Sequence, residues 1–420
     1  MRKLKIALVH DFLKEYGGAE RVVEALHDIW PEAPIYTSFV DYTSLGPHAE
    51  RIKTWQIVES PFGSSWIMKK FHSPLRFLAP LVWEKFDFSD FDVVISSSGW
   101  YISRGIKTIK PTVHICYLHH PPRHLYGYPT AVEWQKYWPV RLYAGIVNHY
   151  LRMYDYNAAQ CVDYFIANSN ETKRRIEKFY RRDSTVIYPP ASQVDHRETL
   201  RTVPPVDLKL EVGNSNVENE VRKKKLDNRP LNIQPQHQRS NLELPTSYYL
   251  VVSRLARAKH IDLAIKACQE LGEPLVIVGK GRDKEYLTSI ASSQQSKVTF
   301  LGEVADEDLP FIYHNARALV FPAEDEEFGI VPVEAMGYGI PVIAYRSGGV
   351  IETVIEGTTG VFFDELNVAS VGNAIKYFDK SIYRSDAVLK SVRSACKKQA
   401  SNFSKERFEK EIREYIGSLV

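Results

Sequence analysis

The order of hydrophobic and polar residues divides the chain into two stretches of alternating strands and helices. Over the first 190 residues, short apolar runs alternate with segments of helical periodicity, which indicates a parallel α/β sheet. Helices are predicted over 18–30 and over 138–162, among others. The strands predicted in this stretch are 5–10, 34–39, 52–58, 92–97, 112–118, 164–168 and 185–188.

The same alternation resumes at residue 247 and ends in an amphipathic helix. The strands predicted there are 248–252, 274–278, 298–301, 318–321, 341–344 and 360–363. Residues 191–246 are rich in Asn, Gln and Lys and have little apolar periodicity, so we expect a disordered linker or insertion. The predicted organisation is an N-terminal domain over 1–190, the linker, a C-terminal domain over 247–402, and a last helix over 403–420 that packs back toward the N-terminal domain.

Composition narrows the class of protein without selecting a function. A chain of 420 residues with 44% hydrophobic and 25% charged residues is long enough for two globular domains. A net charge of +3 gives no reason to expect a nucleic-acid partner. The four cysteines have no metal-binding spacing, and no apolar run reaches the ~20 residues that span a bilayer. The N-terminus enters a strand directly, so we expect a cytoplasmic protein without a signal peptide.

Two glutamates eight positions apart lie where a strand is followed by a loop and a helix. Eight helical residues turn through roughly 800°, so Glu326 and Glu334 would not share a face of one helix. A loop at Phe328 and Gly329, with a helix from about Pro332, places Glu326 on the loop and Glu334 in the first helical turn. The free N–H groups of that turn favour an anion. The segment therefore predicts a site for a ligand with a phosphate and several hydroxyl groups.

A second polar segment follows the first strand of the C-terminal stretch. Arg254 and Lys259 lie just beyond its carboxyl end, where open α/β sheets bind ligands. Two cations there would stabilise a departing diphosphate more than the intact substrate. Taken alone, the pair would more simply be interpreted as two exposed cations on a loop. The Gly279–Lys280–Gly281 turn and Val304 follow the next strands of this stretch.

The N-terminal stretch carries polar residues at corresponding places. His10 and Asp11 end its first strand, and Gly17 and Gly18 open the first helix, where backbone amides could meet a phosphate or sugar. His119 and His120 end a later strand, and which of them faces a ligand is open. Arg123 follows as a candidate contact to an acceptor or a phosphate.

These motifs together resemble the retaining family-4 glycosyltransferases of the GT-B fold. The resemblance rests on Glu-x7-Glu with its Phe-Gly and Gly-x-Pro-Val-Ile-Ala context, on Arg-Leu-x-x-x-Lys, and on Gly-Gly-Ala-Glu-Arg. It implies two Rossmann-like doubly wound domains facing a central cleft. It also implies catalytic roles for Arg254, Lys259, Glu326 and His119. The donor contacts that it implies are Gly17, Gly18, Gly279, Val304, Phe328, Gly329, Ile330, Val331 and Glu334, with His120 and Arg123 as weaker acceptor or phosphate contacts.

Within the family, the N-terminal motifs look most like bacterial mannosyltransferases of O-antigen and exopolysaccharide assembly. That resemblance implies GDP-mannose as donor, a glycan or lipid-linked acceptor, and no cofactor or metal ion. A UDP-sugar donor, or a catalytically silent scaffold that binds a nucleotide sugar, remains an alternative. A dehydrogenase is disfavoured because Gly17 and Gly18 lack the Gly-x-Gly-x-x-Gly spacing after the first strand.

Two segments raise the question of a membrane surface. Residues 101–150 are basic and interspersed with aromatic residues, which fits either anionic lipid headgroups or a mildly basic face. The run Trp66–Phe71 fits either an interfacial contact or a buried helix. Peripheral attachment to the inner face of the cytoplasmic membrane is therefore an open expectation.

Overall fold

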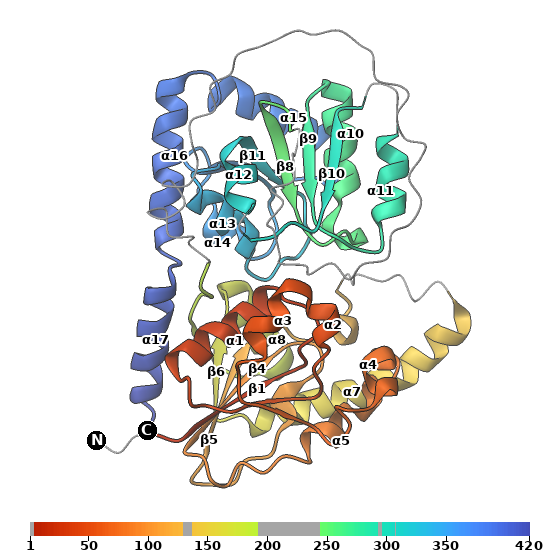
Figure 1. The fold of residues 1–420 in the computed structure, drawn as a ribbon, viewed down its shortest axis with the longest axis vertical. Coiled ribbons are helices and arrows are strands. Elements are labelled where there is room, and N and C mark those ends of the chain that lie inside the picture. Colours follow the sequence, from red (N-terminus) through yellow and green to blue (C-terminus); the bar gives the residue numbers. More distant parts are fainter. Residues whose placement is uncertain (1–3, 129–136, 192–243, 293–295, 307) are drawn as a thin grey trace, which may run out of the picture. The chain divides into compact units, whose positions relative to one another are not determined.

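The chain contains two parallel β-sheets, each covered by helices (Figure 1). The computed structural model describes residues 4–128, 137–191, 244–292, 296–306 and 308–420. The predicted linker lies outside the described residues except at its two ends. The two doubly wound sheets confirm the α/β architecture expected from the alternation of strands and helices.

The N-terminal sheet has seven strands in the order β3-β2-β1-β4-β5-β6-β7, and all neighbours are parallel. The order reverses between the central strands β1 and β4, so their carboxyl ends form the place where such sheets bind ligands. The strands are β1 (Ile6–His10), β2 (Ile35–Thr37), β3 (Ile57–Glu59), β4 (Val93–Ser98), β5 (Val113–Leu118), β6 (Tyr164–Ala167) and β7 (Thr185–Val186).

Helices join these strands. They are α1 (Gly18–Ile29), α2 (Tyr42–Leu45), α3 (Ala49–Ile52), α4 (Trp66–Phe71), α5 (Ala79–Trp83), α6 (Arg123–Tyr126), α7 (Trp138–Cys161) and α8 (Asn170–Tyr180). The strand predicted over 52–58 was wrong at its start, because Ile52 ends helix α3. Its side chain packs with Leu13 and Leu45, and the backbone turns through residues 53–55 before β3 begins.

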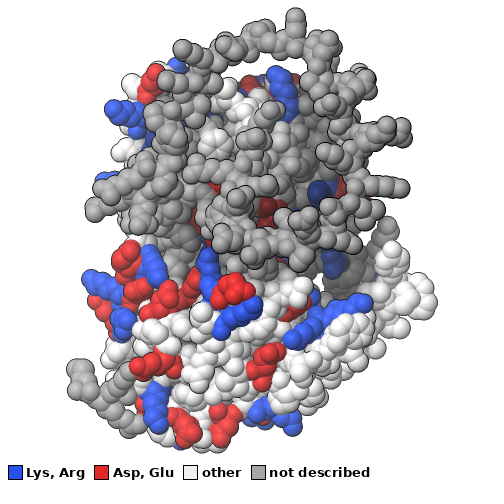
Figure 2. Space-filling model, in the orientation of Figure 1, with Lys and Arg blue, Asp and Glu red and all other residues white. Residues whose placement is uncertain are grey.

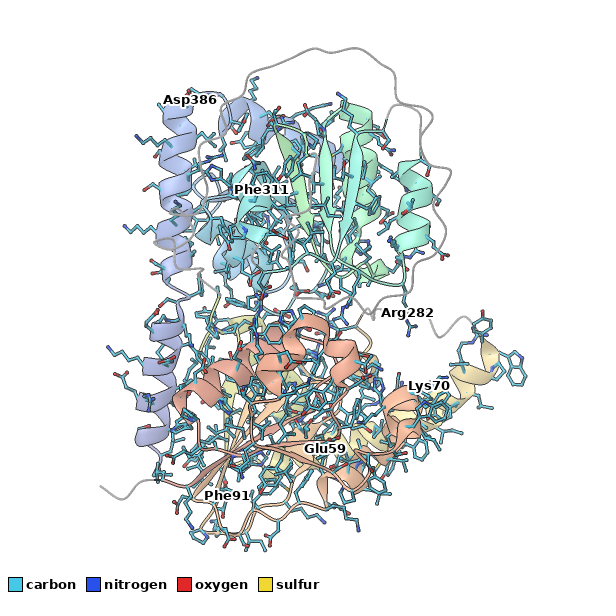
Figure 3. All side chains as sticks on the ribbon, in the orientation of Figure 1. Glu59, Lys70, Phe91, Arg282, Phe311 and Asp386 are labelled. Atoms are coloured by element: carbon cyan, nitrogen blue, oxygen red, sulfur yellow. The ribbon has the colours of Figure 1, made fainter. Side chains whose placement is uncertain are left out.

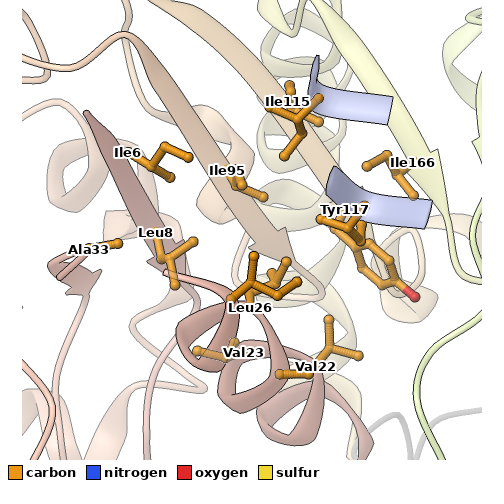
Figure 4. Close-up of a cluster of buried hydrophobic side chains, with 14 of the residues drawn as sticks. Ile6, Leu8, Val22, Val23, Leu26, Ala33, Ile95, Ile115, Tyr117 and Ile166 are labelled. Carbon is orange, nitrogen blue, oxygen red and sulfur yellow. The ribbon is translucent and has the colours of Figure 1, made fainter. Parts of the chain in front are cut away.

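The largest core of this region lies between β1, β4 and helix α1 (Figure 4). Val22, Val23 and Leu26 recur at helical spacing and pack on Leu8 and Ile95 of the sheet. The last helix, α17 (Lys405–Gly417), adds Phe408, Ile412 and Ile416 to the same cluster. Residues from the end of the chain therefore complete the N-terminal core.

The second sheet has six parallel strands in the order β10-β9-β8-β11-β12-β13, with its own reversal between β8 and β11. The strands are β8 (Tyr248–Val252), β9 (Leu275–Val278), β10 (Val298–Gly302), β11 (Ala316–Phe321), β12 (Val342–Tyr345) and β13 (Gly360–Phe363). The helices are α10 (Ile261–Leu271), α11 (Lys284–Ala291), α12 (Leu309–His314), α13 (Ile330–Gly337), α14 (Val350–Thr353), α15 (Val368–Ser381) and α16 (Asp386–Ser401).

Candidate functional site

The two charged segments of the C-terminal region lie at the carboxyl ends of neighbouring strands. β8 leads into residues 253–259, and β11 leads into residues 322–329 before α13. Because parallel strands point their carboxyl ends the same way, both segments emerge at one edge of the sheet. The backbone N–H of Glu324 donates to the carbonyl of Ala258 at 3.3 Å, which ties the two segments together.

Two of the predicted catalytic residues form an ion pair at this edge. Lys259 Nζ lies 2.5 Å from Glu326 Oε2, and both side chains are about one-fifth exposed. Next to them, His260 Nε2 lies 3.4 Å from Glu324 Oε2. Lys259 and Glu326 are 67 positions apart in the sequence, and they meet because β8 and β11 are adjacent strands.

Arg254 is held out from the same loop, with 61% of its side chain exposed and Nη1 3.2 Å from Glu15 Oε2. The glycines of the predicted Gly-x-Gly turn pack against this loop. A Cβ on Gly279 would lie 1.9 Å from the carbonyl oxygen of Ser253, and one on Gly281 would lie 2.1 Å from that of Leu255. The missing side chains therefore let the β9 turn support the loop that carries Arg254. Contact of Gly279 with a donor stays a prediction.

Helix α13 begins at Ile330, two residues before the predicted start. Gly329 has a φ of +82° and caps the helix, a left-handed conformation that glycine adopts without strain. Glu334 consequently lies in the second turn, and the prediction of the first turn was wrong. The first backbone amides of α13, including that of Val331, lie where an anion would be favoured.

Phe328, predicted as a donor contact, lies in a packed aromatic group. Its ring is buried against Tyr188 and Phe403, with ring centroids 5.7 Å and 5.4 Å away. The ring thus anchors the loop before α13. Val304 is half-buried and follows β10, consistent with the place predicted for it.

The start of α1 meets the start of α13. Glu334 forms an ion pair with Arg21 of α1, and a Cβ on Gly18 would lie 3.8 Å from Ile330 Cγ2. Gly17 caps α1 and donates its N–H to Glu20 Oε2 at 2.8 Å. The predicted Gly17, Gly18, Ile330 and Glu334 are therefore brought together, and Arg21 is an additional cation of this group.

At the end of β1, Asp11 organises the backbone after β4. Its carboxylate accepts hydrogen bonds from the N–H groups of Gly99, Tyr101 and Ser103 at 3.0, 3.0 and 2.9 Å. The carboxylate is buried, so these three bonds hold the chain that leaves β4 in one conformation.

A chain of buried polar groups runs from α1 to His119. Glu20 Oε1 lies 3.3 Å from His10 Nε2, and His10 Nδ1 lies 3.2 Å from the hydroxyl of Ser97. The same hydroxyl lies 2.7 Å from His119 Nε2. A serine hydroxyl has one proton to donate, so donation to His119 leaves it an acceptor from His10. With Ser97 as the donor, a neutral His119 carries its proton on Nδ1.

The environment sets the two histidines apart in charge. Burial lowers the pKa of His119 well below its ordinary value, and the nearby His10 and His120 lower it further. Burial would also lower the pKa of His10, but the hydrogen bond and the charge of Glu20 outweigh it and raise that pKa. His119 is therefore neutral near pH 7, and the hydroxyl of Ser97 orients its ring.

His120 and Arg123, the two residues predicted as weaker contacts, lie in different surroundings. Burial lowers the pKa of the His120 imidazole, whose Nδ1 lies 3.0 Å from the carbonyl oxygen of Pro121. Arg123 makes two hydrogen bonds to Glu327, at 2.7 and 2.6 Å, and one to the carbonyl of Asp325 at 2.8 Å. Burial would raise the pKa of Glu327, but Arg123 outweighs it and lowers that pKa. Arg123 is thus committed to an ion pair, and its predicted contact with an acceptor or a phosphate stays a prediction.

Among the described residues, no group of three or more His, Cys, Asp or Glu side chains is arranged to hold a metal ion. The expectation that the chain needs no metal or cofactor stays a prediction. In the same part of the chain, no helix combines the length and the apolar character that crossing a bilayer requires.

Comparison with known proteins agrees with this geometry. The model of glycosyltransferase family 4 matches residues 16–192, and that of the glycosyl transferases group 1 matches residues 232–389. The alpha-1,3/1,6-mannosyltransferase ALG2 of Candida glabrata is 28% identical over 84% of this chain and 78% of its own length. A GDP-mannose-dependent alpha-(1-6)-phosphatidylinositol monomannoside mannosyltransferase of Mycolicibacterium smegmatis is 36% identical over 30% of this chain and 36% of its own length.

Other curated relatives match over only 33% to 45% of their own length. Among solved structures, HepE of Anabaena in complex with UDP and glucose superposes with a TM-score of 0.64 at 17% identity. The superposition covers 99% of this chain and 100% of HepE, and at that identity it speaks for the fold alone.

Two doubly wound domains of this kind define an α/β protein of GT-B fold. The two family models lie one after the other along the sequence and together span most of it. The chain belongs to the family-4, group 1 glycosyltransferases.

Several residues of the site were not predicted from the sequence. Arg21 is the last residue of the Gly-Gly-Ala-Glu-Arg motif, but the motif does not predict its ion pair with Glu334. Ser97 lies in a run of three serines at the end of β4, where only one points to His119. Glu327, the neighbour of Glu326, turns to Arg123 instead of Lys259.

Proposed function

We propose that this chain is a retaining mannosyltransferase that takes its sugar from GDP-mannose. The observation that carries the proposal is the ion pair of Lys259 with Glu326 at one edge of the C-terminal sheet, on the loop that leads into α13, the helix that carries Glu334. A cation, two carboxylates and free helix amides at one edge suit a diphosphate joined to a polyhydroxylated ring. The mannosyltransferase names of two relatives support mannose, and one of those names specifies GDP-mannose.

In this proposal, the C-terminal region provides electrostatic stabilisation. Arg254 and Lys259 exchange their carboxylate partners for phosphate oxygens, and their attraction grows as the bond between sugar and phosphate breaks. The leaving phosphate oxygen takes the proton of the acceptor hydroxyl on the same face, which retains the anomeric configuration. Neutral His119 offers its Nδ1–H to a hydroxyl of the sugar.

The acceptor is proposed to be a glycan or a lipid-linked oligosaccharide of cell-surface polysaccharide assembly, reached at the cytoplasmic face of the membrane. A UDP-sugar is the second candidate donor, since HepE was solved with UDP and glucose. It ranks behind GDP-mannose because HepE resembles this chain in fold only.

Thermal unfolding in the presence of nucleotides tests the donor. A ligand that binds only the folded chain raises its stability in proportion to the logarithm of ligand concentration over Kd. We expect GDP-mannose and GDP to raise Tm more than UDP-glucose or ADP-glucose does. We expect Glu334→Ala to abolish most of that rise, with Glu409→Ala on α17 as a control. A larger shift with UDP-glucose would overturn the donor, and no shift with any nucleotide would overturn the proposal.

The stereochemistry needs a second measurement. Transfer from GDP-α-mannose to a simple mannoside acceptor should give an α-linked product, whose anomeric configuration is read by NMR. A β-linked product would exclude the retaining mechanism while leaving the donor assignment intact.

A further inference from the structure

Helix α7 is apolar on two opposite faces. One face is buried and packs Val147 and Leu151 against Ile102 and Leu125. The opposite face carries large apolar side chains that are 50% to 70% exposed, namely Trp138, Leu142, Ile146, Tyr150 and Met153. At about 100° per residue, these five lie within an arc of about 120°. A helix that covers a domain with one face normally presents polar residues on the other.

A second element extends this apolar stripe. On α4, Trp66, Ile67 and Phe71 are also exposed, and the chain that follows is attached to α7. Arg76 Nη2 lies 3.0 Å from Asn148 Oδ1, and the hydroxyl of Tyr143 donates to the carbonyl of Pro74. Figures 1 and 3 show α4 beside α7, with Lys70 on α4 labelled in Figure 3. We call the exposed residues of α4 and α7 the apolar-basic face.

The charges on this face have one sign. Lys69 and Lys70 lie on α4, and Arg141 and Arg152 lie on α7. The only carboxylate on either helix is Asp155, which is buried and pairs with Arg104. Figure 2 shows this area as largely white, with blue across it.

The basic surface expected over 101–150 differs from the exposed cations that the structure shows. Arg104 is fully buried, Arg123 is paired with Glu327, and Lys136 lies outside the described residues. The exposed cations that matter instead border the apolar stripe of α7.

We propose that the apolar-basic face docks the chain on an anionic lipid bilayer. Exposed Trp, Tyr and aliphatic side chains suit the headgroup boundary, and cations suit anionic headgroups. Of the four cations, Lys69 also has an acidic neighbour, because its Nζ lies 4.0 Å from Glu59 Oε2 of β3. A hollow of about 470 Å³ continues the stripe and is lined by Arg152, Met153, Tyr156 and Phe179, among others. It gives room for part of a lipid beside a cation.

A second copy of the chain is a weaker occupant. In a two-fold symmetric dimer, the same patch faces itself, so the four cations of one copy would approach those of the other. Like charges at short range disfavour that arrangement, whereas an anionic bilayer complements them.

The inference deepens the proposed function. It rests on that function in one respect, because a lipid-linked acceptor is the reason for the chain to approach a membrane. Docking itself depends on α4 and α7 and on no residue of the nucleotide site. The two proposals can therefore fail separately.

Vesicle flotation of the full chain provides the test. We expect the chain to float with vesicles of phosphatidylglycerol and phosphatidylethanolamine in equal amounts, with at least about tenfold higher affinity than for phosphatidylcholine vesicles. The variant Leu142→Ser/Ile146→Ser/Met153→Ser should lower that affinity about tenfold or more. The variant Lys69→Gln/Lys70→Gln should reduce the preference for the anionic vesicles.

A matched triple variant controls for the loss of exposed apolar residues in general. Ile109, Phe311 and Tyr377 are 76%, 46% and 57% exposed and belong to neither α4 nor α7, with Phe311 labelled in Figure 3. Replacing these three with Ser should leave vesicle binding unchanged. Equal losses in both triple variants would overturn the assignment of the face.

Two further outcomes count against docking. A chain whose Tm rises with GDP-mannose but which floats with neither kind of vesicle would overturn it and leave the proposed function intact. If light scattering shows a wild-type dimer that the α7 triple variant dissociates, without any vesicle binding, the face is an interface between copies. Vesicle binding without any nucleotide shift would instead support docking and sink the proposed function.

Discussion

The two sheets present polar residues at the same kind of edge, but they secure them in opposite ways. At the ends of β1, β4 and β5, Asp11, Ser97 and His119 are buried. Asp11 accepts from the N–H of Gly99 after β4, and Ser97 of β4 is hydrogen-bonded to His119 after β5. At the end of β8 and β11, Arg254 and Lys259 are partly exposed and paired with carboxylates on other segments. One edge is fixed by the fold, and the other is held by exchangeable ion pairs.

This difference bears on what each edge can do. The exposed ion pair of Arg254 with Glu15 contributes about 0–1 kcal/mol, so a phosphate can replace that carboxylate at little cost. Lys259 and Glu326 are only about one-fifth exposed, and a phosphate that replaces Glu326 would restore a charged partner to Lys259. A buried hydrogen-bonded group cannot be rearranged without leaving a donor or an acceptor unpaired. The C-terminal edge is therefore suited to capture and release an anion, and the N-terminal edge to hold a fixed shape against a neutral part of the ligand.

The largest effect should come from the buried edge. Asp11→Ala leaves the N–H groups of Gly99, Tyr101 and Ser103 without their acceptor. At about 1–3 kcal/mol for each unpaired buried group, the free energy of unfolding should fall by at least 3 kcal/mol. Urea unfolding followed by circular dichroism measures it.

A matched control for this variant is Asp41→Ala, which removes a partly exposed carboxylate that caps α2 through the N–H of Ser44. That change should cost about 1 kcal/mol. If Asp11→Ala costs no more than Asp41→Ala, the N-terminal edge is not held by Asp11.

The exchangeable edge should respond in turnover and not in stability. We expect Arg254→Ala and Lys259→Ala each to lower kcat for GDP-mannose by about 100-fold or more, because the lost cation acts on charge that develops as the phosphate departs. Unfolding by urea should be nearly unchanged for Arg254→Ala, since that side chain is mostly exposed. Steady-state kinetics measures the first effect, with Lys266→Ala on α10 as a control. Wild-type kcat in both variants would mean that these cations do not act on the leaving group.

The two edges also differ in how well the sequence predicts them. The motifs around Arg254 and around Glu334 are each contiguous, and their strands are strongly apolar, so residue types and spacing placed them at the sheet edge correctly. Their pairing across β8 and β11 follows from strand order, which the motifs do not encode. The buried edge joins His10 to Ser97 over 87 positions, and no local pattern distinguishes Ser97 from its neighbours Ser96 and Ser98.

Local backbone conformation explains the smaller errors. The start of α13 was placed near Pro332 because proline favours the first turn, but the left-handed Gly329 begins the helix earlier. Ile52 was assigned to a strand because it is apolar and β-branched, whereas its burial serves helix α3. In both cases a tertiary contact or a glycine conformation outweighed residue preference.

Neighbouring serines of β4 allow a sharper test of the buried edge. Ser97 Oγ lies 2.7 Å from His119 Nε2, and Ser96 Oγ lies 2.9 Å from His114 Nε2 on the other side of the strand. Ser97→Ala should lower kcat about tenfold, because His119 loses the bond that orients its ring. Ser96→Ala should cost similar stability but leave kcat near the wild-type value.

The pH dependence of kcat separates positioning from general damage in this pair. In Ser97→Ala, His119 is free to change its tautomer, so the acid limb of the kcat profile should move relative to the wild type. In Ser96→Ala it should not move. Equal loss of kcat in both variants, with unchanged profiles, would reduce Ser97 to a structural role.

The smallest expected effect is a fall in the free energy of unfolding in mild acid. It arises from histidines of the N-terminal region whose pKa values are lowered by burial. Burial lowers the pKa of His114 and of His124 to about 3, and lowers that of His119 well below 6.5. In the unfolded chain these rings regain an ordinary pKa near 6.5. The unfolded chain then binds more protons, so the free energy of unfolding falls as pH falls through that value. The raised pKa of His10 acts in the opposite direction.

Between pH 7 and pH 6, each of these three histidines should lower the free energy of unfolding by about 0.7 kcal/mol. Urea unfolding at the two pH values measures the total for all histidines, including His120, whose pKa is also lowered by burial, and His10, whose pKa is raised. Single variants therefore isolate each contribution. His124→Asn should remove about 0.7 kcal/mol of this pH dependence. A pH dependence that is the same in His124→Asn as in the wild type would mean that His124 becomes protonated in the folded chain, and that this part of the N-terminal region is less closed to water than its burial indicates.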